Sequence, residues 1–476
     1  MRRGKCYLHS LLFIVAFLVL LVLLTSVNGR FSVDEFEHIH SAWYVRTGHV
    51  PYSDFFQHHN PLLWYVMAPF LWVFGHTVRT VMVFRFLMFI FTLGIAYLTY
   101  LISRALTDSK EAGLFSVLLL LSMRTFVGSA LEIRPDIPMV LFGLLSIYYL
   151  VKFLQTNENW RITLCGLFAS ISFLFLQKMI FLLFAYAAIF VCQLSRKQMS
   201  AKGVLYFCVS FLAPQAVLAG YLMTTGSFRD YILANWLVNV TRDMTDTRFG
   251  LSLPLAVMGF RRRTRGFWVL CALAVALVLR DKKTSVELKT VAFICLVLFL
   301  SLSVYRQLSD HYFMFAISAL CIVVACFLKI GFDNLKLAEA PRMLLILLVI
   351  FIPAHLQSRE IDLVSDNDLQ LEKADFVLAN SEDCDLVYDG YNQFNLYRGD
   401  LHYFWYALGK DKSFGAYNML TKNKYGDYDI CELIRSKRPK FISDFEVDIS
   451  GSGLAELYRK TRFDGLYIRK AESQQQ

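Results

Sequence analysis

About eleven apolar runs, several of them near the roughly 20 residues that a membrane-spanning helix needs, divide the first 356 residues of the chain. The 476-residue chain is 56% hydrophobic and only 18% charged, which excludes a soluble globular domain, a disordered chain and a coiled coil. The runs are Leu8–Val27, Val81–Leu101, Ala112–Met123, Ile137–Leu154, Ile162–Leu176, Met179–Leu194, Val204–Met223, Phe267–Leu279, Val291–Val304, Tyr312–Leu328 and Met343–Leu356.

Basic residues in alternate connections predict the orientation of these spans. They lie on the same side as Arg2, for example Arg104 with Lys110 and Lys329 with Lys336. Cytoplasmic loops of membrane proteins are enriched in Lys and Arg, so we expect the N-terminus inside and, with an odd number of spans, the C-terminal segment outside. The exception is the run of basic residues at 261–265. Either it is an anion site on the outer face, or residues 249–260 form an additional short span.

Residues 357–476 differ in character from the rest. They carry 16 basic and 21 acidic residues, a net charge of −5, against +15 for the remainder, and this distribution argues against nucleic-acid binding. Helical and strand patterns alternate at Asp368–Asn380, Asp385–Asp389, Tyr428–Lys437, Lys440–Ser443 and Gly465–Ile468. We therefore predict an all-α polytopic membrane domain (1–356) and a small C-terminal α/β extracytoplasmic domain (357–476). In that compartment Cys384 and Cys431 could pair.

The segment between the first two spans, residues 28–80, is rich in groups that can do chemistry. A helical pattern begins at Asp34 and Glu35 and continues through Phe36, Ile39 and Trp43, which predicts an interfacial helix with its apolar side on the membrane. The helix dipole favours an ionised carboxylate at such an N-terminus, and an ionised carboxylate can act as a general base. The alternative is that these carboxylates only cap the helix.

Four of the histidines in the same segment are candidate ligands, at positions 38, 40, 58 and 59. Imidazoles are common metal ligands, so a divalent metal remains open. The simpler interpretation is that they form hydrogen bonds, and we expect no metal and no cofactor to be required.

Charged side chains also stand at the predicted outer ends of later spans. Charges at membrane depth are costly and are therefore usually functional or paired. A pocket that binds a phosphate is one interpretation, because a lysine or arginine suits an anionic group, and an ion pair between Arg134 and Asp136 is the other. The residues are Arg134, Asp136, Lys178, Arg306, His311 and Tyr312.

The order of these motifs resembles the GT-C superfamily of integral-membrane glycosyltransferases. The pattern is most similar to the branch that contains protein O-mannosyltransferases and the aminoarabinose–lipid A transferase. The matching motifs are Asp34-Glu35, Gly48–Tyr52, His58–Leu62, Arg85, Arg134–Asp136, Lys178 and His311-Tyr312.

This resemblance implies transfer of a sugar from a polyprenyl-phosphate carrier to an acceptor hydroxyl, usually with inversion. It implies that Asp34 is the base, that Glu35 and Asp136 position sugar or acceptor, and that Lys178 and Arg306 hold the carrier phosphate. The remaining candidates for substrate or phosphate binding are His58, His59, Arg134, His311 and Tyr312. The chain departs from some members at His59-Asn60, where they have an acidic-basic pair before the proline.

The expected partners are a polyprenyl-phosphate-linked sugar, a glycan, lipid or protein acceptor, and the lipid bilayer. We expect a multi-pass protein of a bacterial inner membrane with its active site on the periplasmic side. A polysaccharide polymerase or ligase that uses lipid-diphosphate donors is one alternative. A lipid transporter or flippase is another, but it predicts charges near mid-span and an inverted repeat, and the sequence shows neither.

Overall fold

The computed structural model describes residues 2–244, 265–304, 309–358, 367–391, 393–405, 413–426 and 428–471. The chain forms two compact units. The first unit comprises Met1–Val27, Arg85–Val217 and Arg248–Leu363, and the second comprises Asn28–Phe84, Leu218–Thr247 and Val364–Gln476. These units join distant segments, whereas the predicted division at residue 356 separates a membrane part from a soluble part, and that division stays a prediction.

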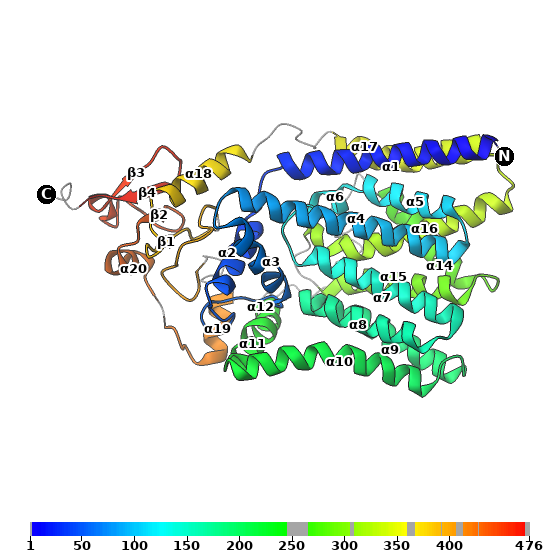
Figure 1. Ribbon diagram of the computed structural model, residues 1–476, viewed down its shortest axis with the longest axis horizontal. Coiled ribbons are helices and arrows are strands. Elements are labelled where there is room, and N and C mark those ends of the chain that lie inside the picture. Colours follow the sequence, from blue (N-terminus) through cyan, green and yellow to red (C-terminus); the bar gives the residue numbers. More distant parts are fainter. Residues whose placement is uncertain are drawn as a thin grey trace. The chain divides into compact units, whose positions relative to one another are not determined.

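The first unit is built mainly from long helices that lie side by side with their axes roughly aligned (Figure 1). Each predicted apolar run lies in, or largely overlaps, one of its helices. They are α1 (Arg2–Asn28), α4 (Arg79–Thr107), α5 (Lys110–Ser122), α6 (Arg124–Ser129), α7 (Asp136–Thr156), α8 (Asn159–Phe175), η1 (Gln177–Met179), α9 (Ile180–Ser195), α10 (Ala201–Thr224), α14 (Arg265–Arg280), α15 (Val286–Ser301), η4 (Leu302–Val304), η5 (Asp310–Phe313), α16 (Met314–Asn334) and α17 (Glu339–Ser358).

Among the described residues, 7 helices are long and apolar enough to cross a membrane. Large apolar side chains on these helices are exposed, such as Phe13 on α1, Val191 on α9 and Val217 on α10. Apolar surface of this extent is suited to lipid rather than water. The predicted class, a polytopic helical membrane protein with a small C-terminal sheet, is confirmed, while the number of eleven spans stays a prediction.

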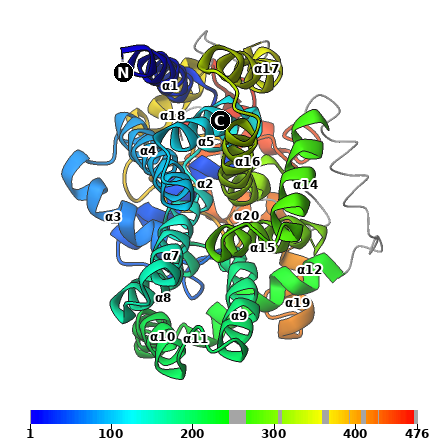
Figure 2. The same ribbon diagram turned by 90° about the vertical axis from the view of Figure 1, so that its right-hand side faces the viewer.

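Helix α16 is the most buried of these candidate spans, and other helices of the first unit surround it (Figure 2). A Cβ atom added to Gly143 of α7 would lie 2.5 Å from the Phe315 ring of α16. Small residues allow membrane helices to approach closely in this way. The contact brings the beginning of α16 close to α7.

In the second unit, α2 (Val33–Arg46) is buried along its length, from Glu35 to Tyr44. The prediction of an interfacial helix with one apolar face on the membrane is therefore wrong, because protein covers both faces. The neighbouring α3 (Leu62–Phe74) exposes Trp72 and Val73 at its end and is better suited to a membrane surface. The other helices are α11 (Phe228–Tyr231), η2 (Ile232–Leu237), α12 (Val238–Met244), α18 (Asp368–Ala379), α19 (Phe414–Thr421), α20 (Ile430–Lys437) and η7 (Leu454–Glu456).

The C-terminal residues form a four-stranded sheet of order β1-β2-β4-β3. Its strands are β1 (Val387–Tyr388), β2 (Phe441–Ser443), β3 (Tyr458–Lys460) and β4 (Leu466–Arg469). Strands β1 and β2 are parallel, and β4 pairs antiparallel with both β2 and β3. The predicted strands and the helices α18 and α20 are confirmed, whereas β3 and α19 had no counterpart among the predictions. Cys384 and Cys431 are free cysteines.

Candidate functional site

A buried carboxylate lies at the centre of a charged cluster in the first unit. Asp136, the first residue of α7, is only 2% exposed. Lys178 donates from Nζ to Asp136 Oδ1 at 3.0 Å, and Arg134 Nε lies 3.5 Å from Oδ2. Burying an ionised carboxylate is costly unless cations compensate it, and here two cations from separate segments do so.

Two aromatic residues of η5 complete this cluster. Arg134 Nη2 lies 3.0 Å from His311 Nε2, and Lys178 Nζ lies 3.6 Å from the centroid of the Tyr312 ring. The structure thus brings together five predicted site residues from three distant parts of the chain. The sixth, Arg306, and residues 261–264 of the basic run lie outside the described residues.

Local sequence explains how these side chains reach one place. Pro135 stands at the N-terminus of α7, where a proline is tolerated, and the helix dipole favours the carboxylate of Asp136 next to it. Leu176 is extended and separates α8 from α9, so the single turn of η1 presents Lys178 between two apolar helices. An ammonium and a guanidinium have several N–H donors each, so this cluster can hold an anion such as a phosphate in addition to Asp136.

The predicted general base lies in the second unit. Asp34 is the second residue of α2 and is half-buried, so the helix dipole acts on its carboxylate. Glu35 is fully buried, and its Oε1 accepts a hydrogen bond from the Ser32 N–H at 3.0 Å. The geometry therefore gives Glu35 a capping role and leaves Asp34 as the stronger candidate for catalysis.

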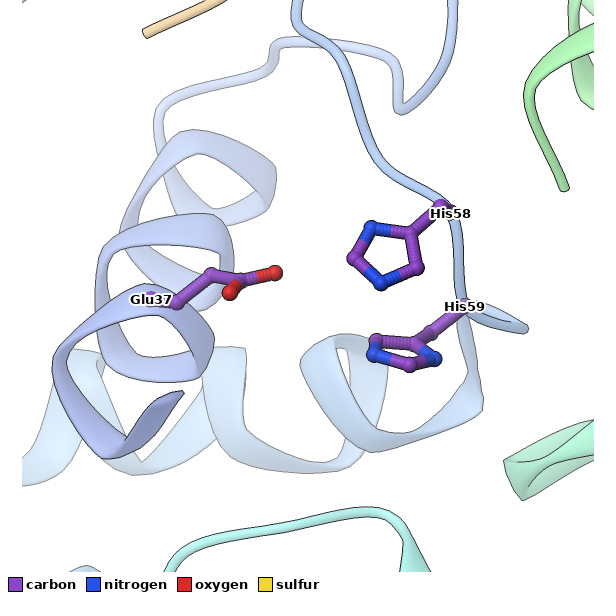
Figure 3. A group of neighbouring side chains, drawn as sticks. All are labelled: Glu37, His58 and His59. Atoms are coloured by element: carbon purple, nitrogen blue, oxygen red, sulfur yellow. The ribbon is translucent and has the colours of Figure 1, made fainter. Parts of the chain in front are cut away.

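A second group of side chains meets one turn further along α2. Glu37 projects from the helix toward His58 and His59, which lie on the segment before α3 (Figure 3). One possible ligand atom from each of the three lies within 4.8 Å of the others. The sequence analysis named both histidines but missed Glu37, although its spacing of three residues from Asp34 places both carboxylates near one face of a helix.

The two histidines that lie on α2 itself, His38 and His40, form hydrogen bonds within the second unit. His40 lies between the Leu396 carbonyl oxygen at 3.1 Å and Asp400 Oδ2 at 2.7 Å. His38 Nδ1 accepts a hydrogen bond from Trp64 Nε1 at 3.2 Å. For these two the simpler interpretation, hydrogen bonding within the protein, describes the contacts seen.

Three comparisons bear on the identity of the chain. Residues 58–218 match the family of dolichyl-phosphate-mannose-protein mannosyltransferases. The structure is similar to that of ArnT from Cupriavidus metallidurans in the apo state, with a TM-score of 0.68 and 13% identity over 98% of this chain and 99% of ArnT. The resemblance to GT-C membrane glycosyltransferases is confirmed.

Other solved structures share the fold. ArnT from Cupriavidus metallidurans bound to undecaprenyl phosphate gives a TM-score of 0.67 at 14% identity, covering 97% of this chain and 98% of ArnT. The oligosaccharyltransferase AglB from Archaeoglobus fulgidus, in complex with an inhibitory peptide and a dolichol-phosphate, gives 0.54 at 13% identity. This match covers 98% of this chain and 74% of AglB. No curated protein matches the chain in sequence.

The second unit also contains a cavity of about 570 Å³. Aromatic rings of Trp43, Tyr44 and Tyr403 line it together with the carboxylates of Asp54 and Asp400. Ligand pockets commonly combine apolar and aromatic walls with a few polar groups that fix orientation. Rings and carboxylates in this combination can contact the apolar face and the hydroxyl groups of a sugar.

His402 lines the same cavity, and its lowered pKa predicts that the stability of the protein depends on pH. Burial, with a smaller effect of nearby Lys437, lowers the pKa of His402 to about 4, and its Nδ1 accepts the Phe404 N–H at 3.1 Å. In the unfolded chain this histidine takes up its proton near pH 6.5, whereas in the folded chain it does so only near pH 4. Its contribution to the free energy of unfolding is therefore fully present above pH 6.5 and is lost as the pH falls toward 4. We expect the thermal midpoint of purified protein to fall over this range, and His402→Phe to reduce the slope. His49→Gln, which changes an exposed histidine, should keep the wild-type slope; an unchanged slope in His402→Phe contradicts the assignment.

Proposed function

We propose that this chain transfers a sugar from a polyprenyl-phosphate carrier to a hydroxyl acceptor, with inversion at the anomeric carbon. The observation that carries this proposal is the cluster of Arg134, Asp136 and Lys178, which places two cations at the ends of apolar helices. The family match supports it, as does the shared fold with ArnT, which has been solved with undecaprenyl phosphate bound. A lipid carrier held in the bilayer would present its phosphate at the level of such helix ends.

Lys178 and Arg134 are the proposed binding groups for the leaving phosphate. As the bond between the anomeric carbon and the phosphate oxygen breaks, that oxygen keeps the electron pair and negative charge develops on the phosphate. Lys178 and Arg134 stabilise this charge, and positioned donors of this kind usually make the largest single contribution to catalysis. Asp136 holds both cations in place because it contacts each of them.

Asp34 is the proposed general base. Asp34 accepts the proton of the acceptor hydroxyl while the acceptor oxygen bonds to the anomeric carbon. General base assistance is typically worth about 10²–10⁴-fold in rate. The acceptor is a hydroxyl of a glycolipid, a polysaccharide or a protein, and basic connections on the side of Arg2 favour an active site at the outer face of a bacterial inner membrane.

Mass spectrometry of envelope glycans in a deletion strain tests this function. We expect one sugar to be missing from a glycolipid, polysaccharide or protein, and restored by the wild-type gene. Purified protein in liposomes with a synthetic polyprenyl-phosphate sugar should release free polyprenyl phosphate only when acceptor is present. Glycans identical to the parent, or turnover only with a lipid-diphosphate sugar, would overturn the proposal. Movement of the intact lipid between leaflets without sugar transfer would instead indicate a flippase.

A further inference from the structure

We propose that Glu37, His58 and His59 form a binding site for one divalent transition-metal ion of the zinc class. Their ligand atoms lie within 4.8 Å of one another. Zinc binds imidazole nitrogen at about 2.0–2.1 Å, so tetrahedral ligands lie about 3.3 Å apart. The three side chains therefore need to close by only about 1.5 Å to hold an ion, which rotation about side-chain bonds can supply.

The ligand types indicate which metal fits. Two imidazoles with one carboxylate are typical of zinc and other late first-row metals, whereas Mg²⁺ and Ca²⁺ prefer oxygen ligands throughout. Three protein ligands leave a fourth position of the tetrahedron open to water or to an oxygen of a bound molecule. The site is thus of the open kind, in contrast to structural zinc sites closed by four side chains.

Hydrogen bonds from neighbouring side chains orient the Glu37 carboxylate. Gln57 donates from Nε2 to Glu37 Oε1 at 3.1 Å and to Ser41 Oγ at 2.8 Å. Ser41 in turn donates to the Glu37 carbonyl oxygen at 2.8 Å, which ties the three residues together. Metal-binding side chains commonly have such supporting hydrogen bonds, and these fix their orientation.

The two imidazoles are held through their backbone. Tyr52 donates its hydroxyl to the His59 carbonyl oxygen at 2.6 Å, and Asn239 donates from Nδ2 to the His58 carbonyl oxygen at 2.8 Å. The ring centroids of His58 and His59 lie 4.1 Å apart. Two adjacent imidazoles whose backbone is fixed in this way form a preorganised pair. Both rings lie close to the Glu37 carboxylate, so an ion between them would contact all three side chains.

Nearby His38 is not part of the proposed set. Its ring centroid lies 5.5 Å from that of His59, but its Nδ1 accepts the hydrogen bond from Trp64. An ion at the proposed site would connect α2 to the segment before α3, two parts of the same unit. It would add its binding free energy to the stability of the folded state.

Metal titration of the full-length protein in detergent tests this site without donor or acceptor, so its result is independent of the proposed function. After removal of metal by a chelator, we expect one equivalent of Co²⁺ to give the visible absorption of a tetrahedral complex, and Zn²⁺ to displace it. His58→Gln with His59→Gln should lower affinity at least 100-fold. Gln57→Ala should lower it about 10–100-fold, because a supporting hydrogen bond is lost.

His49→Gln is the matched control, since it removes an exposed histidine of the same segment and should leave the titration unchanged. Absence of the absorption band in wild-type protein overturns the site whether or not the variants fold. Equal stoichiometry and affinity in the wild type and in the double histidine variant would place the metal elsewhere. That result too would overturn the proposal, and it would leave the trio as a hydrogen-bonded group.

Discussion

Replacing Asp34 with Asn is expected to reduce sugar transfer by about 10²–10⁴-fold, the usual worth of a general base. The substitution keeps the size of the side chain and its place in the first turn of α2, but removes the group that accepts the acceptor proton. Because an amide can still interact with the helix N-terminus, the fold should survive. The measurement is the initial rate of transfer by purified protein in liposomes, alongside its thermal midpoint.

A matched control is available on another helix. Asp368 is the first residue of α18 and is exposed, so Asp368→Asn makes the same change at a comparable helix position and should leave the rate unchanged. Glu35→Gln weakens the hydrogen bond that caps α2 and should lower stability by about 0.5–2 kcal/mol with a small effect on rate. A rate near that of the wild type in Asp34→Asn would remove Asp34 from the mechanism. An equal loss in Asp368→Asn would indicate a general effect of charge.

Replacing Lys178 with Met is expected to lower the rate of transfer by about 10²–10³-fold. This is the usual loss when an enzyme loses one of the donors that stabilise a developing oxyanion. It should also raise the apparent KM for the carrier lipid. The same change removes one cation from the buried carboxylate of Asp136, and breaking such a pair destabilises a protein by about 3–5 kcal/mol. A loss of activity alone would therefore not separate a catalytic role from a structural one.

The double variant Lys178→Met with Asp136→Asn makes this separation. It removes the carboxylate that Lys178 neutralises, so much of the stability should return while transfer stays low. Recovery of transfer in the double variant would show that Lys178 only compensates Asp136 and does not bind phosphate. Lys329→Met is the control, because Lys329 lies 3.8 Å from Glu111 in another ion pair at a helix end and should not affect the KM for the lipid.

Much of the first unit and of its charged cluster could be predicted from sequence. Apolar runs near the length of a bilayer are a strong local signal, and each one lies in or overlaps a helix. The cost of placing charges at membrane depth singles out Arg134, Asp136 and Lys178 in the sequence, and these three side chains meet in the structure. The side of the membrane on which these residues lie follows from the positive-inside rule and stays a prediction.

The second unit was predicted less well because its signals are weak or distant. Helix α3 has 13 residues with a proline inside, too short for a span and easily read as a loop. Strand β3 has three residues, of which only the first is buried, so it carries almost no alternating pattern. The pattern of α2 suggested one covered face, but residues more than 350 positions away contact its other side.

The contact between His40 and Asp400, 360 residues apart, has a consequence for biosynthesis. At a translation rate of about 5–20 residues per second, the residues that contact α2 are made roughly 20–70 s after it. Until then the side of α2 that contacts Leu396 and Asp400 is uncovered. The covering of α2 is therefore completed only late in synthesis, and a chain that stops before residue 393 has no partner for the surface that α2 leaves open.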